Sequence, residues 1–202
     1  MYCLDLQDTF TIQRLTVSDD LLVGCAAKIY SEEIGDYHPK KNLIQRISDQ
    51  QAFLLLALGK NQEPLGAVTG WILQDEDTIK EKFNLKSAEV SVGYIQSLAV
   101  SNSYQKRGLG RALVKNILQC FSSLGCEQAI TVAWERSFTF FNKQGFRLQK
   151  EIPYYWKSES LNTPDFCVKC GSPCECDAFL MSTKLEPTIY ENLAIANTNA
   201  KL

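Results

Sequence analysis

The stretch Gln105-Lys-Arg-Gly-Leu-Gly-Arg-Ala-Leu113 places two glycines and three cations directly before a helical pattern. From Gly108 to Leu124 apolar residues recur at helical spacing, and Gly125 ends the pattern. Backbone amides at a helix N-terminus have no intrahelical partner, and the helix dipole favours an anion there. Gly108 and Gly110 carry no side chain that would hold a diphosphate away from those amides. The stretch therefore predicts a pyrophosphate-binding loop.

Other phosphate-binding patterns fit this loop less well. The dinucleotide fingerprint requires a third glycine, and a P-loop ends in Gly-Lys followed by Ser or Thr. A glycine pair before a helix, taken alone, is equally compatible with a plain strand-to-helix turn. The function of the loop therefore depends on the residues around it.

The patterns on both sides of the loop predict alternating strands and helices. Strands are expected at residues 9–14, 52–59, 65–73, 90–100, 129–134, 146–155 and 177–185, and helices at 21–30, 42–48, 108–124 and 137–143. An acidic surface insertion is expected at 75–86. The segment 186–202 is polar and without pattern, which is typical of a flexible tail.

Three segments resemble motifs of the GNAT superfamily of N-acetyltransferases. The strand end Leu98-Ala-Val100, followed by Gln105-Lys-Arg-Gly-Leu-Gly110, resembles motif A. Phe140-Phe-Asn-Lys-Gln-Gly-Phe146 resembles motif B, and Asp177-Ala-Phe-Leu-Met181 is similar to the last strand of the family. The resemblance covers roughly residues 9–185. It implies an α/β fold with a mixed, mostly antiparallel sheet, a central V-shaped splay and flanking helices, in one domain over residues 1–185.

The resemblance also implies acetyl-CoA as co-substrate. The main chain of Leu98 to Val100 would pair with the pantetheine arm, and the amides of Lys106 to Arg111 would hold the pyrophosphate. A backbone donor near Ile95 would polarise the thioester carbonyl. The residues expected to bind the cofactor are Leu98, Ala99, Val100, Gln105, Lys106, Arg107, Gly108, Leu109, Gly110, Arg111, Phe141 and Lys143.

The acid and the base of the reaction are less clear from the motifs. Members of the family often carry a base on the strand before the loop, and the matching residues here are Tyr94 and Gln96. Neither is a strong base, yet Tyr94 is able to protonate the leaving sulfur or to hold a water with Gln96. The tyrosine that serves as acid in motif B is replaced by Phe141. His38, the only histidine, lies in a loop expected near the acceptor pocket; a surface position is the alternative.

Four of the eight cysteines lie within ten residues: Cys167, Cys170, Cys174 and Cys176. Four thiolates suit a structural zinc site, within a cysteine-rich insertion expected at 158–176 between the last two strands. The spacing is tighter than in most structural zinc sites. A reduced surface hairpin, a redox-responsive dithiol pair and a metal shared between chains are alternatives. Zinc is favoured because the chain shows no secretion signal.

Composition excludes several classes of partner. A net charge of −2 and a pI of about 5.5 argue against binding to nucleic acid. The longest apolar run, 52–58, is too short to span a membrane. Residues 1–11 lack the basic and apolar parts of a signal peptide, so a cytoplasmic protein is expected. A homodimer is compatible with the sequence.

The predicted function is transfer of an acetyl group from acetyl-CoA to a primary amine, by direct attack in a ternary complex. The acceptor is a small molecule, a peptide or a protein, because arylalkylamines, polyamines, antibiotic amines, peptide N-termini and lysines fit the donor half equally well. An acyl-CoA-binding sensor or pseudoenzyme is the alternative, since the usual acid and base are missing. A zinc-dependent interaction module built on the fold is a third hypothesis.

Overall fold

The computed structural model describes residues 10–35, 38–74, 83, 91–155 and 176–186. One sheet contains the strands β1 (Thr11–Arg14), β2 (Ala52–Leu58), β3 (Pro64–Ile72), β4 (Val92–Val100), β5 (Gln128–Trp134), β6 (Arg147–Ile152) and β7 (Ala178–Lys184). The helices are α1 (Asp20–Ile34), α2 (Lys40–Ile47), α4 (Leu109–Ser123) and α5 (Glu135–Lys143), with a 3-10 helix η1 at Asn102–Tyr104. The expected insertion at 75–86 apart from Phe83, most of the cysteine-rich insertion and the tail after Glu186 lie outside the described residues.

The strands are ordered β1-β2-β3-β4-β5-β7-β6. Every neighbouring pair is antiparallel except β4 and β5, which are parallel and connected through α4. A parallel connection needs a crossover of this kind, because a tight turn reverses the chain. The prediction of a mixed, mostly antiparallel sheet flanked by helices is confirmed.

One strand ends earlier than expected. The prediction extended it to Tyr155, whereas β6 ends at Ile152. Pro153 follows directly; it has no N–H to donate to a strand ladder. Tyr154 then has a φ of 53°, which turns the chain out of the extended conformation.

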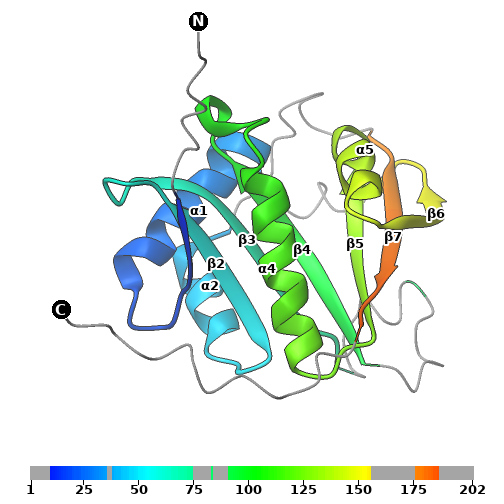
Figure 1. Cartoon of the computed structure of the whole chain (residues 1–202), viewed down its shortest axis with the longest axis horizontal. Helices are drawn as coiled ribbons and strands as arrows, with labels where there is room; N and C mark the ends of the chain where they lie inside the picture. Colours follow the sequence, from blue (N-terminus) through cyan, green and yellow to red (C-terminus); the bar gives the residue numbers. More distant parts are fainter. Residues whose placement is uncertain (1–9, 36–37, 75–82, 84–90, 156–175, 187–202) are drawn as a thin grey trace, which may run out of the picture.

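Helices cover both faces of the sheet (Figure 1). In that view α4 crosses in front of the sheet, while α1 and α2 lie behind it. Apolar residues under α4 include Phe53, Val68, Ile95, Leu113, Ile117 and Phe121. The residues packed between the sheet and α1 and α2 include Val23, Tyr30, Leu54, Leu56, Ala67 and Ala99. Each face therefore has its own apolar core.

The sheet opens between β4 and β5. Their pairing runs from Val92 opposite Gln128 to Ile95 opposite Thr131, although both strands continue further. The Thr131 hydroxyl donates to the Ile95 carbonyl over 3.1 Å at this last pair. Figure 1 shows the two strands diverging toward the end at which α4 begins. The V-shaped splay expected from the family resemblance is present.

A β-bulge in β4 coincides with the opening. Thr69 of β3 lies opposite Ser97, but the next residue, Gly70, lies opposite Ile95. Gln96 is thus the extra residue of β4, and its side chain is exposed. A bulge bends the strand that carries it, which re-aims the side chains on either side.

The approach of β3 to β4 at Gly70 leaves no room for a side chain. A Cβ there would lie 2.3 Å from the Tyr94 carbonyl oxygen. We expect Gly70→Ala to lower the free energy of unfolding by about 1–3 kcal/mol or more, because the strands must separate. Gly24→Ala is the matched control. Its Cβ would meet only the Lys40 Cδ at 3.7 Å, and alanine in the interior of α1 should add up to about 1 kcal/mol. Urea unfolding of both variants checks the prediction, which fails if Gly70→Ala unfolds like the wild type.

Candidate active site

The glycine loop begins α4 with its amides open. Lys106 and Gly108 both have left-handed backbones, with φ of 61° and 87°. Gly108 is the N-cap of α4, and no side chain caps this helix. The first intrahelical bond is donated by Ala112 to the Gly108 carbonyl, so the preceding amides have no acceptor within the helix. A Cβ on Gly108 would meet no heavy atom within 4 Å.

The loop is fastened to the end of β4. The Gln105 side-chain amide donates to the Val100 carbonyl over 2.9 Å and to the Asn102 side chain over 3.0 Å. The backbone N–H of Asn102 donates to the Glu33 carboxylate of α1 over 3.0 Å. These bonds fix the direction of the chain as it leaves the strand, so the helix start is held in place before any ligand binds.

The cationic side chains of the loop favour an anion, as its open backbone amides do. Lys106, Arg107 and Arg111 are exposed, and the Arg107 guanidinium lies over the Tyr104 ring at 5.5 Å. An uncapped helix start, a glycine that leaves space and three cations together suit a bound diphosphate. The residues present therefore fit the pyrophosphate of a coenzyme.

The end of β4 offers main-chain groups at the opening. Val100, Ala99 and Leu98 pair with β3 on one side, opposite Gly66, Ala67 and Val68. On the other side the ladder with β5 has already ended at Ile95. In the described part of the chain, the edge at Leu98–Val100 that faces β5 thus has no strand partner.

The two motif-B residues of the prediction lie on α5. Phe141 is 4% exposed and packs edge-on against the rings of Phe140 and Phe146 in the core under α4. Lys143 is exposed. The half-buried Phe140 is the residue that approaches the glycine loop: its ring lies 3.4 Å from the position of a Cβ on Gly110. This role of Phe140 is not predictable from the sequence, because a pair of adjacent phenylalanines does not show which ring faces which element.

Tyr94 and Gln96 both lie on β4 at the opening of the sheet. Tyr94 is 7% exposed, and its ring meets Trp71 edge-on with centroids 5.0 Å apart. It belongs to an apolar cluster with Val92, Trp71, Ile130, Val132, Tyr155 and Leu180, on the face opposite α4. Gln96 occupies the exposed bulge. The structure thus brings both residues to the place where β4 leaves β5.

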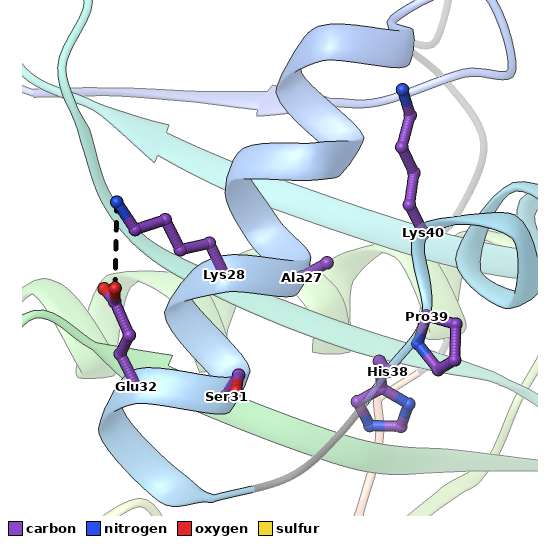
Figure 2. A pocket seen from close by; sticks show the side chains of 7 residues that line it. All are labelled: Ala27, Lys28, Ser31, Glu32, His38, Pro39 and Lys40. Carbon is purple, nitrogen blue, oxygen red and sulfur yellow. Dashed lines mark ion pairs between the residues drawn. The ribbon is translucent and has the colours of Figure 1, made fainter.

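His38 lies between α1 and α2, where its ring contacts two side chains. In the structure its Nε2 lies 2.9 Å from the hydroxyl oxygen of Ser97 on β4, and its ring meets Tyr30 edge-on at 5.4 Å. His38 also lines a surface pocket of about 290 Å³ between α1 and the start of α2 (Figure 2). The residues of this pocket are Ala27, Lys28, Ser31, Glu32, His38, Pro39 and Lys40.

Three cysteines of the expected zinc site, Cys167, Cys170 and Cys174, lie outside the described residues. Cys176 is 5% exposed and comes just before β7. Within the described ranges no group of three or more His, Cys, Asp or Glu residues is placed to hold a metal ion. Burial raises the pKa of the Cys120 and Cys126 thiols, so these two stay protonated at neutral pH.

Comparison with known proteins identifies the family. Residues 20–146 match the Acetyltransferase (GNAT) family. The chain belongs to this family. Acetyl-CoA-dependent N-acetylation is general in the GNAT family, so the features of the loop and the opening agree with its chemistry.

One sequence relative of this GNAT chain is the glucosamine 6-phosphate N-acetyltransferase of Trypanosoma brucei brucei, with 39% identity over 57 residues. That match covers 28% of the chain and 39% of the relative, so the chain spans well under half of the relative's length. Sequence similarity to this relative is therefore local.

Solved structures share the fold over most of their length. Arabidopsis thaliana NAA60 bound to a bisubstrate analogue has a TM-score of 0.67 and 15% identity, covering 89% of this chain and 100% of that one. The ribosomal-protein-S18-alanine N-acetyltransferase of Escherichia coli has a TM-score of 0.63 and 14% identity, covering 91% and 99%. At these identities the likeness shows the fold alone.

In the part of the chain that the structure describes, no helix has the length and apolar character needed to cross a membrane.

Proposed function

We propose that this GNAT chain transfers an acetyl group from acetyl-CoA to a primary amine of a small molecule, a peptide or a protein. The observation that carries the proposal is the uncapped, glycine-led start of α4 beside the point where β4 leaves β5. An anion site at the start of α4 and a strand edge of β4 without a ladder partner among the described residues therefore lie next to each other. A coenzyme with a diphosphate at one end and amides in its arm matches both.

The donor would bind along β4 and α4. The amides from Lys106 to Arg111 would hold the pyrophosphate, with Gln105 fixing the loop. The edge at Leu98–Val100 would pair with the amides of the pantetheine arm. A backbone N–H near Ile95, at the bulge, would donate to the thioester carbonyl.

The acceptor would approach from the face covered by α1 and α2. The core under α4 fills the other face, with Ile95, Leu113 and Ile117 all buried. Tyr94 faces away from that core, within reach of the opening. Its hydroxyl would protonate the departing thiolate, which Phe141 cannot do because it has no hydroxyl. Gln96 at the bulge would orient the acceptor or a water.

A second function, that of an acyl-CoA-binding sensor, is supported by Phe141. This buried ring stands where the motif carries an acid, and it packs in the core. A sensor would bind acetyl-CoA and transfer nothing. Assay of acetyl-CoA turnover over a panel of amines separates the two functions, since tight binding without turnover on any amine favours the sensor.

Gly108→Ala tests the donor site. An alanine at φ 87° costs roughly 1–2 kcal/mol of stability because the left-handed backbone strains it. We expect the methyl group, which has no protein atom within 4 Å, to fill space needed by the pyrophosphate and to weaken acetyl-CoA binding at least tenfold.

Gly125→Ala is the matched control. Its φ is 82°, and a Cβ there also meets nothing within 4 Å, but it lies at the far end of α4. The two variants should lose similar stability by urea unfolding. Only Gly108→Ala should lose affinity by calorimetry. Equal affinities of the two variants for acetyl-CoA would refute the proposed donor site.

Tyr94→Phe tests the acid. The variant keeps the ring that packs on Trp71 and removes only the hydroxyl. If the hydroxyl protonates the leaving sulfur, we expect kcat to fall about 10²-fold, with unchanged affinity for acetyl-CoA. Steady-state kinetics and calorimetry on the same preparation measure both. A kcat equal to that of the wild type would remove Tyr94 from the mechanism.

We also propose a structural zinc ion held by Cys167, Cys170, Cys174 and Cys176. The proposal is supported by four thiols within ten residues of sequence and by the buried position of Cys176. Protein purified without added zinc should contain about one zinc per chain by elemental analysis. Cys170→Ser should lose the metal, whereas Cys120→Ser, outside the cluster, should retain it. A wild-type chain free of zinc would refute the site.

A further inference from the structure

His38 and Ser97 meet on the face of the sheet that α1 and α2 cover. His38 lies between the end of α1 and the start of α2, and Ser97 lies 59 residues later on β4. The distance between Nε2 and the hydroxyl oxygen is 2.9 Å. Ser97 is 3% exposed and His38 is half-buried, so the bond is partly shielded from water. A hydrogen bond in such surroundings is stronger than one in water.

Ser97 stands at the level of the thioester in the proposed complex. It follows the Gln96 bulge and lies between Ile95, which is near the thioester carbonyl, and the edge that pairs with pantetheine. Alternation along the strand places Leu98 against the core under α4. The Ser97 side chain therefore faces the opposite side, the one from which the acceptor would come.

The other side of His38 opens to solvent. Figure 2 shows its ring beside Pro39 at one end of the surface pocket. The charged residues that line the pocket with His38 are Lys28 and Glu32 of α1 and Lys40 of α2, and Figure 2 shows their charged ends pointing away from the imidazole. The Tyr30 ring lies edge-on to the His38 ring. Lys28 pairs with Glu32 at 3.7 Å, and Lys40 pairs with Asp20. A single imidazole thus connects a buried hydroxyl on β4 with bulk water.

We propose that Ser97 and His38 form a proton relay that deprotonates the acceptor amine. This inference rests on the proposed function. Histidine is the side chain that ordinarily titrates closest to neutral pH, which suits a proton acceptor. With the ring in the Nδ1–H tautomer, Nε2 accepts the Ser97 hydroxyl proton while the Ser97 oxygen takes a proton from the acceptor ammonium.

The protons and electrons of the transfer then balance. The freed amine lone pair forms the N–C bond, and the C–S bond breaks with its electron pair leaving on sulfur. The ammonium loses two protons in all. One passes through Ser97 to His38 and out through the pocket to water, and the second protonates the thiolate. His38 accepts its proton from Ser97 and does not contact the thioester, so it acts on the reaction only through Ser97.

Imidazole rescue tests the relay. We expect His38→Ala to lower kcat about 10²-fold with unchanged affinity for acetyl-CoA. Free imidazole should restore a large part of the lost kcat, because the pocket beside His38 is open to solvent. Ser97→Ala should lower kcat equally and resist rescue. The double variant should be no slower than either single one, since both residues serve the same step.

Glu32→Gln is the matched control. Glu32 lines the same pocket from α1 and pairs with Lys28 of the same helix, so this variant should keep the wild-type kcat and should not respond to imidazole. His38→Gln, which keeps a polar side chain, is the second variant and should lose kcat like His38→Ala. A role in packing alone would lower the free energy of unfolding and give no imidazole rescue, and that result overturns the relay.

The remaining outcomes separate the relay from the function on which it rests. An active wild type with undiminished kcat in His38→Ala and His38→Gln would overturn the relay and leave the transferase standing. A wild type that binds acetyl-CoA and acetylates no amine would overturn the proposed function, and the relay with it.

Discussion

The hydrogen bond from the Thr131 hydroxyl to the Ile95 carbonyl marks the last point at which β4 and β5 are held together. Thr131 and Ile95 are both buried, so the Ile95 carbonyl takes from the Thr131 hydroxyl the hydrogen bond that water would otherwise donate. Beyond it, among the residues that the structure describes, the edge of the interior strand β4 that faces β5 has no ladder partner. Unpaired main chain inside a fold is costly unless another partner takes its place. The location of the opening therefore indicates where an extended, amide-bearing ligand belongs.

The two faces of the sheet are packed with different kinds of side chain. Under α4 the side chains are apolar and closely packed, which holds the start of that helix rigidly against β4. The face under α1 and α2 includes the buried polar residues Thr69 and Ser97 as well as apolar ones. Thr69 is satisfied by the Phe53 carbonyl, whereas Ser97 reaches out of the sheet to His38. In the proposed mechanism the donor would bind along the face under α4, and the protons would be handled on the face under α1 and α2.

Features set by short segments were predictable from the sequence. The glycine loop, its helix and the strand before it depend on residues close together in the chain, and their bounds differ from the structure by a few residues at most. The predicted strand end at Tyr155 was wrong, although Pro153 directly after Ile152 is a local signal for the end of β6. The V-shaped opening came from the family resemblance, since no local pattern shows where two strands cease to pair.

Contacts between distant segments were out of reach. His38 and Ser97 are separated in the sequence by α2, β2 and β3, and they meet only because α1 and α2 pack on the face of the sheet that carries Ser97. Phe140 and Phe141 are adjacent and chemically identical, so the rotation of α5 alone decides which ring meets the glycine loop. The roles predicted for Tyr94, Gln96 and the cofactor-binding residues stay predictions, because the structure gives their positions and experiments on the reaction must give their roles.

The position of the only histidine makes the chain convenient to observe. An imidazole that contacts the central strand on one side and solvent on the other reports on both surroundings. Because no second histidine exists in the sequence, its ring resonances in an NMR spectrum need no assignment by mutagenesis. The chain thus carries a built-in spectroscopic probe in contact with the central strand β4.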